Sequence, residues 1–305
     1  MGLRSVAAAV LTAMALAVPS LQAAGVGTTG ASFLKVGVGA RALGMAGATA
    51  AISDDANSIY WNPAGLGQLE KRSVSVSYNQ LFQDESQGFI GFAGPVRGES
   101  KDVFGLGVNY LQVSDIEKRA GDTETPDSTF SNRNFAVALS YARKDAFIDK
   151  LSLGGSVKLV HVKLDSFSEE AFAVDLGAVH KINDELSAGL SVQNLGNKLG
   201  PDPLPLLMKY GVAYRLWDKL IVAADGDHWV RDKRNYGSLG TEYWIVPQFA
   251  IRAGYQLGRA QDQLGGASGL GTGIGVRIER LAVDYAYVPF GDLGHTHRVT
   301  LGARF

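Results

Sequence analysis

Hydrophobic and polar residues alternate along most of the chain from residue 71 onward. Between residues 151 and 159 the odd positions carry mainly leucine and valine, whereas the even positions carry serine, glycine and lysine. Between residues 281 and 287 the odd positions carry leucine, valine and tyrosine, and the even positions carry alanine and aspartate. A period of two residues is typical of a β-strand, because successive side chains point to opposite faces of the sheet. The pattern therefore predicts an all-β fold.

The alternating segments and their connections predict a closed barrel. We predict fourteen strands, at residues 72–80, 87–95, 102–113, 129–142, 150–162, 169–182, 185–195, 205–216, 219–227, 234–245, 247–258, 269–279, 281–289 and 295–305. Short turns such as Asn183-Asp184 alternate with long connectors such as 114–128. Outer-membrane barrels have short turns at one end and long loops at the other, and a tilted strand of ~11 residues crosses their apolar band of ~25 Å. The sequence therefore predicts a 14-stranded antiparallel transmembrane β-barrel.

The polar face of the predicted strands carries charged residues and many glycines. Opposite charges can pair across strands on a lumen wall, and small residues allow another segment to pack closely against it. We therefore predict that the polar face lines the lumen and that the apolar face contacts outer-membrane lipid. The predicted lumen-lining residues are Lys158, Asp175, Arg215, Glu242, Arg252, Arg277, Asp284 and Arg298.

The chain ends on an alternating strand whose last residue is Phe305. This end resembles the terminal strand by which bacterial outer-membrane barrels are recognised for insertion, so we predict Phe305 as an insertion signal and the barrel-assembly machinery as a partner. Aromatic residues near other strand ends predict the girdles that anchor such barrels at the membrane interfaces. These residues are Tyr214, Trp217, Trp244, Tyr255, Tyr285 and Tyr287.

Residues 1–24 have the features of a secretory signal peptide. Arg4 provides the positive charge, residues 6–18 are apolar, and Ala23 and Ala24 are small residues suited to cleavage. A membrane anchor is the alternative, but thirteen helical residues span only ~20 Å of the ~30 Å hydrocarbon core. Beyond residue 24 no apolar run approaches the ~18 residues of a membrane-spanning helix. We therefore predict export and a location in the bacterial outer membrane.

Residues 25–70 do not follow the alternating pattern. We expect a short strand at 33–38 and a helix from Ala42 to Ile52, which is rich in alanine and glycine. Fourteen tilted strands enclose a lumen of roughly 15–18 Å, which would leak if it were empty. We therefore predict a signal peptide at 1–24, an N-terminal plug at 25–70 and the barrel at 71–305; a periplasmic tail is the alternative to the plug.

A motif of small residues, paired aspartates and an aromatic-Asn-Pro-Ala element occupies this N-terminal region. It reads GARALGMAGA at 39–48, DDA at 54–56 and YWNPAGL at 60–66. The motif resembles the N-terminal signature of the PorV/PorQ family, relatives of the FadL long-chain fatty-acid transporters, and residues 293–299 are similar to the family's end pattern. On this resemblance, the plug-motif residues are Gly39, Arg41, Gly44, Gly47, Asp54, Asp55, Asn57, Trp61, Asn62, Pro63 and Gly65.

The resemblance implies a fourteen-stranded barrel with its N-terminal segment in the lumen. It also implies one of two functions: passage of hydrophobic compounds across the outer membrane, or docking of secreted protein cargo in type IX secretion. We favour transport, because the resemblance to FadL-like proteins is the broader one, and a purely structural or adhesive barrel is a third hypothesis. Apolar residues predicted at the loop end would form the access site for a hydrophobic ligand. They are Leu81, Phe82, Leu195, Leu199, Leu204, Leu206 and Leu207.

Composition excludes several kinds of chemistry. The absence of cysteine excludes disulfides, thiolate metal sites and cysteine nucleophiles, and a net charge of −1 argues against nucleic acid as a partner. His295 and His297 share one strand face but lack a third metal ligand in the sequence pattern. Asp227 and His228, in a predicted outer loop, lack a matching nucleophile. We therefore expect no catalytic residue, no metal and no cofactor.

Overall fold

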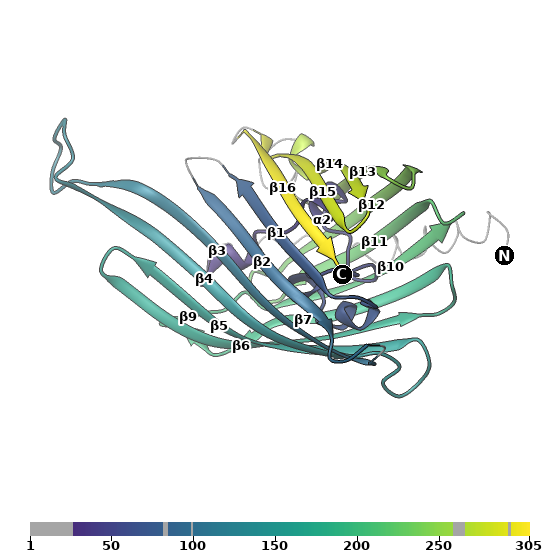
Figure 1. Ribbon diagram of the computed structural model, residues 1–305. Coiled ribbons are helices and arrows are strands. Elements are labelled where there is room, and N and C mark those ends of the chain that lie inside the picture. The colour runs from purple at the N-terminus through teal and green to yellow at the C-terminus, as the bar shows by residue number, and fades with distance from the viewer. Residues whose placement is uncertain (1–26, 82–84, 99, 259–265, 292–293) are drawn as a thin grey trace.

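The computed structural model describes residues 27–81, 85–98, 100–258, 266–291 and 294–305 (Figure 1). The predicted signal peptide lies outside these residues. Within them, fourteen antiparallel strands close into a barrel, which confirms the predicted fold class. The barrel strands are β1 (Ser73–Gln80), β2 (Ser86–Pro95), β3 (Asp102–Lys118), β4 (Ser128–Arg143), β5 (Leu151–Leu164), β6 (Phe167–Lys181), β7 (Leu186–Gly196), β10 (Leu207–Leu216), β11 (Leu220–Trp229), β12 (Arg234–Val246), β13 (Phe249–Leu257), β14 (Leu270–Ile278), β15 (Leu281–Pro289) and β16 (His295–Arg304). The short strands β8 (Lys198–Leu199) and β9 (Asp202–Pro203) form a small hairpin between β7 and β10.

The first and last strands pair with each other and complete the cylinder. Ser73 lies opposite Arg304, and the ladder runs along the whole of β1. Just outside it, the backbone amide of Arg72 donates to the carbonyl of Phe305 at 3.1 Å, and the amide of Phe305 donates back at 3.0 Å. Closure leaves no exposed strand edge in the cylinder.

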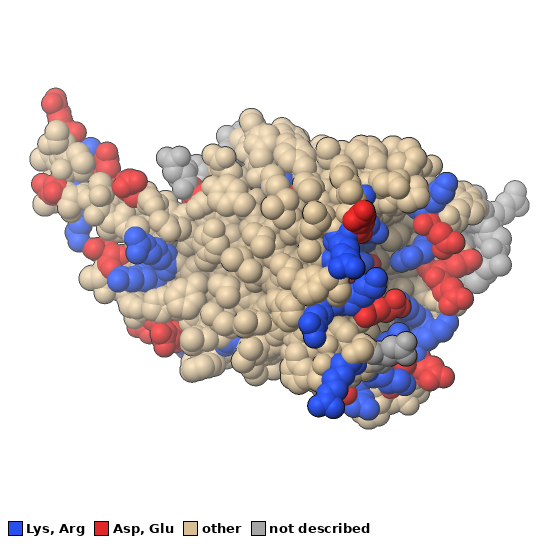
Figure 2. Space-filling view, viewed as in Figure 1, with Lys and Arg blue, Asp and Glu red and all other residues tan. Residues whose placement is uncertain are grey.

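The outer face of the barrel is apolar. Leu139, Phe172 and Leu301 are 59%, 68% and 54% exposed, although their side chains would be buried in a soluble core. Figure 2 shows a broad band without charged side chains between two charged ends. Such a band is the surface that lipid covers in an outer-membrane barrel. None of the helices in the described part of the chain has the length and hydropathy of a membrane-spanning helix.

Four neighbouring strands are longer than the rest, and together they form a projecting wall. Strands β3 to β6 have 17, 16, 14 and 15 residues, whereas β1 and β13 to β15 have only 8 or 9. The β3–β4 hairpin accordingly extends farthest to the left in Figure 1. The predicted connector 114–128 was therefore too long: pairing resumes beyond a β-bulge between Val113 and Ile116, so the loop covers only residues 119–127.

The N-terminal segment, residues 27–70, lies inside the barrel, where Figure 1 shows its purple ribbon among the strands. It contains the short elements η1 (Ser32–Lys35), α2 (Ala40–Gly44), α3 (Ser58–Trp61) and η2 (Pro63–Gln68). A further 3-10 turn, η4 (Gly266–Gly269), precedes β14. The amide of Gly30 donates to the carbonyl of Pro203 at 3.0 Å, and Pro203 lies in the long connection between β7 and β10. The segment therefore runs from the long-loop end to the start of β1 at the short-turn end.

Two predictions within this segment were wrong. The expected strand at 33–38 begins instead with the 3-10 turn η1, and the expected helix from Ala42 to Ile52 ends at Gly44. The helix stops because Ala46 and Gly47 adopt positive φ angles of 52° and 78°, which reverse the chain. The segment is therefore a series of turns rather than a regular helix.

Inward-facing glycines allow the N-terminal backbone to lie directly against the barrel wall. A Cβ atom at Gly154 would lie 2.5 Å from the amide nitrogen of Ala64, and one at Gly254 would lie 2.7 Å from the amide nitrogen of Ala46. A Cβ at Gly189 would clash with the carbonyl of Ala50. These glycines lie on different strands, so they surround the segment from several sides.

Gly154 and its neighbour Gly155 test this contact, because they point to opposite faces of β5. We expect Gly154→Ala to lower the free energy of unfolding by about 1–3 kcal/mol, since its methyl group overlaps Pro63 and Ala64. A Cβ at Gly155 would lie 3.3 Å from the carbonyl of Asp175, a tight contact, and 3.6 Å from the Leu176 side chain, so Gly155→Ala should cost less than Gly154→Ala, about 1 kcal/mol at most. Urea unfolding in detergent, with migration of unheated samples on gels, measures both. Equal effects of the two variants would contradict the packing.

Candidate functional site

The two halves of the N-terminal motif pack on each other. The indole nitrogen of Trp61 donates to the carbonyl of Val38 at 2.9 Å. The Tyr60 hydroxyl lies 2.9 Å from the carbonyl of Leu34 and 3.0 Å from that of Val36, within donating distance of both. The aromatic pair therefore holds residues 34–38 against α3. Gly47 lies against the Trp61 ring, where a Cβ would be 3.5 Å away.

Asn62 connects the turns of the segment to one another and to the wall. Its side-chain oxygen accepts from the amide of Ala64 at 3.2 Å and caps η2, whose first residue is Pro63. Its side-chain nitrogen donates to the carbonyl of Ala50 at 2.8 Å, and Asn62 is fully buried. A Cβ at Gly65 would collide with Ser53. The Asn-Pro-Ala-Gly element thus has a structural role at the core of the segment.

Arg41 is the centre of a buried ionic network. Its guanidinium group donates to both carboxylate oxygens of Glu242, at 2.7 and 2.9 Å, and to Asp54 at 2.5 Å. Arg252 donates to the same Glu242 at 2.7 Å and to Asp284 at 2.7 Å. The network links α2 to β12, β13 and β15, and bidentate pairs of this kind fix orientation as well as distance.

The adjacent aspartates of the motif have opposite electrostatic environments. Burial raises the pKa of a carboxyl group, but the guanidinium groups of Arg41 and Arg304 outweigh burial and hold the pKa of Asp54 below its ordinary value. For Asp55, burial dominates over the attraction of Arg41 and raises the pKa above its ordinary value. Asp55 accepts from the amide of Asn57 at 2.8 Å, and Asn57 accepts from the Ser75 hydroxyl at 3.0 Å.

A second ionic cluster lies beneath the Trp61 ring. Lys209 is fully buried, and its ammonium group lies 2.7 Å from Asp227, 3.1 Å from Asp225 and 5.5 Å from the ring centre. Asp225 also accepts from the amides of Thr49 and Ala50, at 2.7 and 2.8 Å. The sequence prediction missed Lys209, although it shares the inward face of β10 with Arg215 and alternates with apolar residues.

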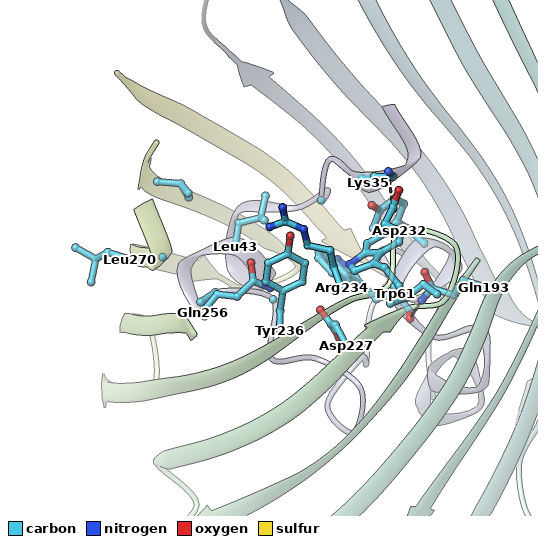
Figure 3. Close-up of a pocket in the computed structure, with 18 of the residues that line it drawn as sticks. Lys35, Leu43, Trp61, Gln193, Asp227, Asp232, Arg234, Tyr236, Gln256 and Leu270 are labelled. Carbon is cyan, nitrogen blue, oxygen red and sulfur yellow. Dashed lines mark hydrogen bonds and ion pairs between the residues drawn. The ribbon is translucent and has the colours of Figure 1, made fainter. Parts of the chain in front are cut away.

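A cavity of about 570 Å³ lies above this cluster, between the N-terminal segment and strands β10 to β15 (Figure 3). Leu43, Trp61 and Leu270 provide apolar lining, whereas Gln193, Arg234 and Gln256 provide polar groups. Lys35 closes one side through an ion pair with Asp232 at 2.7 Å. The cavity is partly open on one side, and a concave space with a few convergent polar groups is typical of a small-molecule site.

An apolar cluster fills the lumen beside the projecting wall. Phe33 and Leu34 of the N-terminal segment pack there against Leu111 and Val160 of β3 and β5. Three residues predicted for an open access site are buried in this cluster, so that prediction was wrong for them. Leu81, Leu199 and Leu204 are buried in the cluster, Leu207 lines the cavity, Leu195 is exposed, and Phe82 lies outside the described residues.

The remaining predicted lumen residues differ in their burial and in the groups that they contact. Lys158 and Asp175 form an ion pair at 2.8 Å, and Arg298 is buried and donates to the carbonyl of Gly37 at 3.2 Å. Arg215 is exposed near the end of β10. Arg277 lies 4.4 Å from the centre of the Trp244 ring.

One girdle prediction and one loop prediction were wrong. Trp244 shares the lumen face of β12 with Glu242, to which its indole donates at 3.2 Å, so it does not face lipid. Asp227 and His228 belong to β11 rather than to an outer loop. As neighbours on a strand they point to opposite faces, which prevents them from acting as a pair. Among the described residues, no group of three or more potential ligands could hold a metal ion.

Comparisons with known proteins agree with this geometry. The family described as type IX secretion system protein PorV matches residues 20–204. Three similar solved structures are the P. putida toluene transporter TodX (TM-score 0.67, 12% identity, 88% of this chain and 99% of that chain), the CymD monoaromatic hydrocarbon channel (0.64, 16%, 88% and 98%) and the Ralstonia pickettii toluene transporter TbuX (0.61, 16%, 88% and 98%). At these identities the likeness shows the fold alone. No curated protein matches the chain.

The two aspartates provide a matched test of the ionic network. We expect Asp54→Asn to lower the free energy of unfolding by about 1–3 kcal/mol at pH 7, because it removes a partner of Arg41 and Arg304. The depressed pKa of Asp54 means that its contribution is present above the unfolded-state pKa of about 3.9 and is lost as the pH falls below it. The difference from wild type should therefore shrink in acid.

Asp55→Asn is the control. Its raised pKa means that the charged form is disfavoured in the folded chain, so stability falls as the pH rises through the unfolded-state pKa to the folded one. The variant should therefore be as stable as wild type, or more stable, at pH 7. Urea unfolding in detergent followed by tryptophan fluorescence measures both variants. A destabilised Asp55→Asn beside an unchanged Asp54→Asn would contradict the assignment.

Proposed function

Because the chain belongs to the family of the type IX secretion system protein PorV and is an outer-membrane β-barrel, we propose that it passes hydrophobic small molecules across the outer membrane. The cavity above the N-terminal segment is the observation that carries this proposal. It lies at the end of the barrel with the longer connections, which is the external end in outer-membrane barrels. A molecule entering there would meet Trp61 and Leu43 of the N-terminal segment at the base of the cavity.

The size of the cavity suits a small ligand, and Leu43, Trp61 and Leu270 offer it an apolar surface. An apolar cavity of about 150 Å³ is enough to hold benzene. The cavity here, of about 570 Å³, has room for a substituted aromatic or a short hydrocarbon chain. Three barrels of similar fold are named as toluene transporters or a monoaromatic hydrocarbon channel, so we take monoaromatic hydrocarbons as the first substrate class to test.

We assign the N-terminal segment the role of a plug that must move for passage. It fills the lumen below the cavity and consists of short turns held by side-chain bonds, notably those of Arg41 and Asn62. The wall, in contrast, is a continuous hydrogen-bonded ladder. Segments with few regular backbone bonds are the ones that open at low free-energy cost. On this proposal, residues 25–70 form one functional unit, the plug, and residues 71–305 form another, the barrel.

Docking of secreted protein cargo is the second candidate function. The family match covers the N-terminal segment and the projecting wall. On the lumen side of that wall, Leu164 and Phe167 are 43% and 47% exposed beyond the apolar cluster. An exposed apolar rim at the external end suits an extended protein partner. In either case we propose no catalytic role.

We also propose that Phe305 is a recognition point for barrel assembly. It follows β16, and 49% of its surface is exposed.

Filling the cavity tests transport. We expect Leu43→Trp to reduce uptake of labelled toluene by proteoliposomes several-fold, because the indole occupies the space above the plug. Leu139→Trp makes the same substitution on the lipid face of β4 and should leave uptake unchanged. Equal uptake by wild type, Leu43→Trp and protein-free vesicles would contradict transport through the lumen and would favour cargo docking.

A disulfide lock tests whether the plug moves. The chain has no cysteine, so introduced pairs have no competing thiols. Cβ atoms at Gly30 and Asp202 would lie 3.3 Å apart and tie the segment to the β8–β9 hairpin, whereas those at Ala282 and Gly302 would lie 3.6 Å apart within the wall. We expect oxidation to reduce uptake several-fold only in Gly30→Cys/Asp202→Cys, with recovery on reduction. Full uptake by that oxidised variant would show that residue 30 need not move.

A further inference from the structure

Two basic residues stand side by side on the lipid-facing side of the projecting wall. Arg133 of β4 and Lys163 of β5 are direct partners in the ladder, and both are exposed. Direct partners on antiparallel strands share a face, with their Cβ atoms about 5 Å apart. Like charges in this arrangement destabilise the sheet, so the pair calls for an explanation.

Nearby carboxylates do not neutralise this pair. Glu170 lies 3.2 Å from His161, and Asp165 and Glu117 pair with Lys118 and Arg119. Among the described residues, no ion pair joins a carboxylate to either member of the pair. Two adjacent, exposed cations therefore face outward from the wall.

The pair lies at the upper boundary of the apolar band. Two residues farther along β4 towards the short-turn end is Phe135, whose ring stacks on His161 at a centroid distance of 4.8 Å and an angle of 20°. Beyond Phe135 the same face carries Val137 and then Leu139, which is 59% exposed. Figure 2 shows basic side chains beside the uncharged band at the projecting end. The pair is therefore level with the headgroups of the external leaflet.

We propose that Arg133 and Lys163 bind a phosphate group of a phosphorylated glycolipid in the external leaflet, the class to which lipopolysaccharide belongs. A planar guanidinium group engages two phosphate oxygens at once, and an ammonium group adds a second charge. Ser168, the ladder partner of Lys163 on β6, offers a hydroxyl donor on the same face. The acyl chains would then lie along Phe135 and Val137. A bound phosphate would offset the repulsion that the two cations otherwise exert on each other.

Native mass spectrometry of the chain purified in detergent tests this site. The probes are diphosphoryl lipid A, fully dephosphorylated lipid A and inorganic phosphate. We expect wild type to bind the diphosphoryl lipid at least about tenfold more tightly than the dephosphorylated one, which corresponds to one charge-assisted contact. Arg133→Gln/Lys163→Gln should lose this preference, while migration of unheated samples on gels confirms that the variant is folded.

Lys118→Gln is the matched control, because it removes one positive charge from the same wall where Asp165 already pairs with it. It should retain the preference of wild type. An equal preference in wild type and the double variant would overturn the proposal, and so would an equal loss in Lys118→Gln. Competition by inorganic phosphate at the lipid's own concentration would show a free-anion site and would also overturn it.

Discussion

The contact between the N-terminal backbone and the inward-facing glycines is the constraint on which the rest of the structure depends. Side chains at Gly154 or Gly189 would occupy the space of that backbone, so the sheet can close around the segment only where hydrogen atoms replace them. The same fit sets the height and rotation of the segment in the lumen. It thereby brings Arg41 to Glu242 and places Trp61 at the base of the cavity.

The strand count and the two faces of the sheet could be predicted because every strand shows the same two-residue alternation. Apolar residues lie on one face of each strand, and small or charged residues lie on the other. The course of the N-terminal segment could not be predicted in this way. Its alanine-rich stretch has the composition of a helix, yet the chain reverses at Ala46 and Gly47, where the backbone meets Gly254 of the wall. Tertiary contact overrides local propensity there. The bulge at Val113 likewise extended β3 beyond the point where the alternation breaks.

The candidate site likewise has a part that the sequence pattern predicts and a part that depends on the tertiary structure. Alternation identifies an inward charge such as Glu242, but its partners depend on strand register and on the position of the segment, neither of which the pattern contains. The alternating pattern also placed Lys209 on the inward face of β10, but the sequence prediction overlooked it. The cavity had no local signal, because it lies between Leu43, Trp229 and Val288, which come from distant parts of the chain.

The path of the N-terminal segment has a consequence for biogenesis. Gly30 is bonded to a long connection at one end of the cylinder, whereas Arg72 is bonded to Phe305 at the other. A finished cylinder offers no sideways route for a chain in this position, and the tight glycine contacts oppose end-on threading. The cylinder is therefore expected to close around a polypeptide that already lies in its interior, so the topology links the placement of the segment to closure of the sheet.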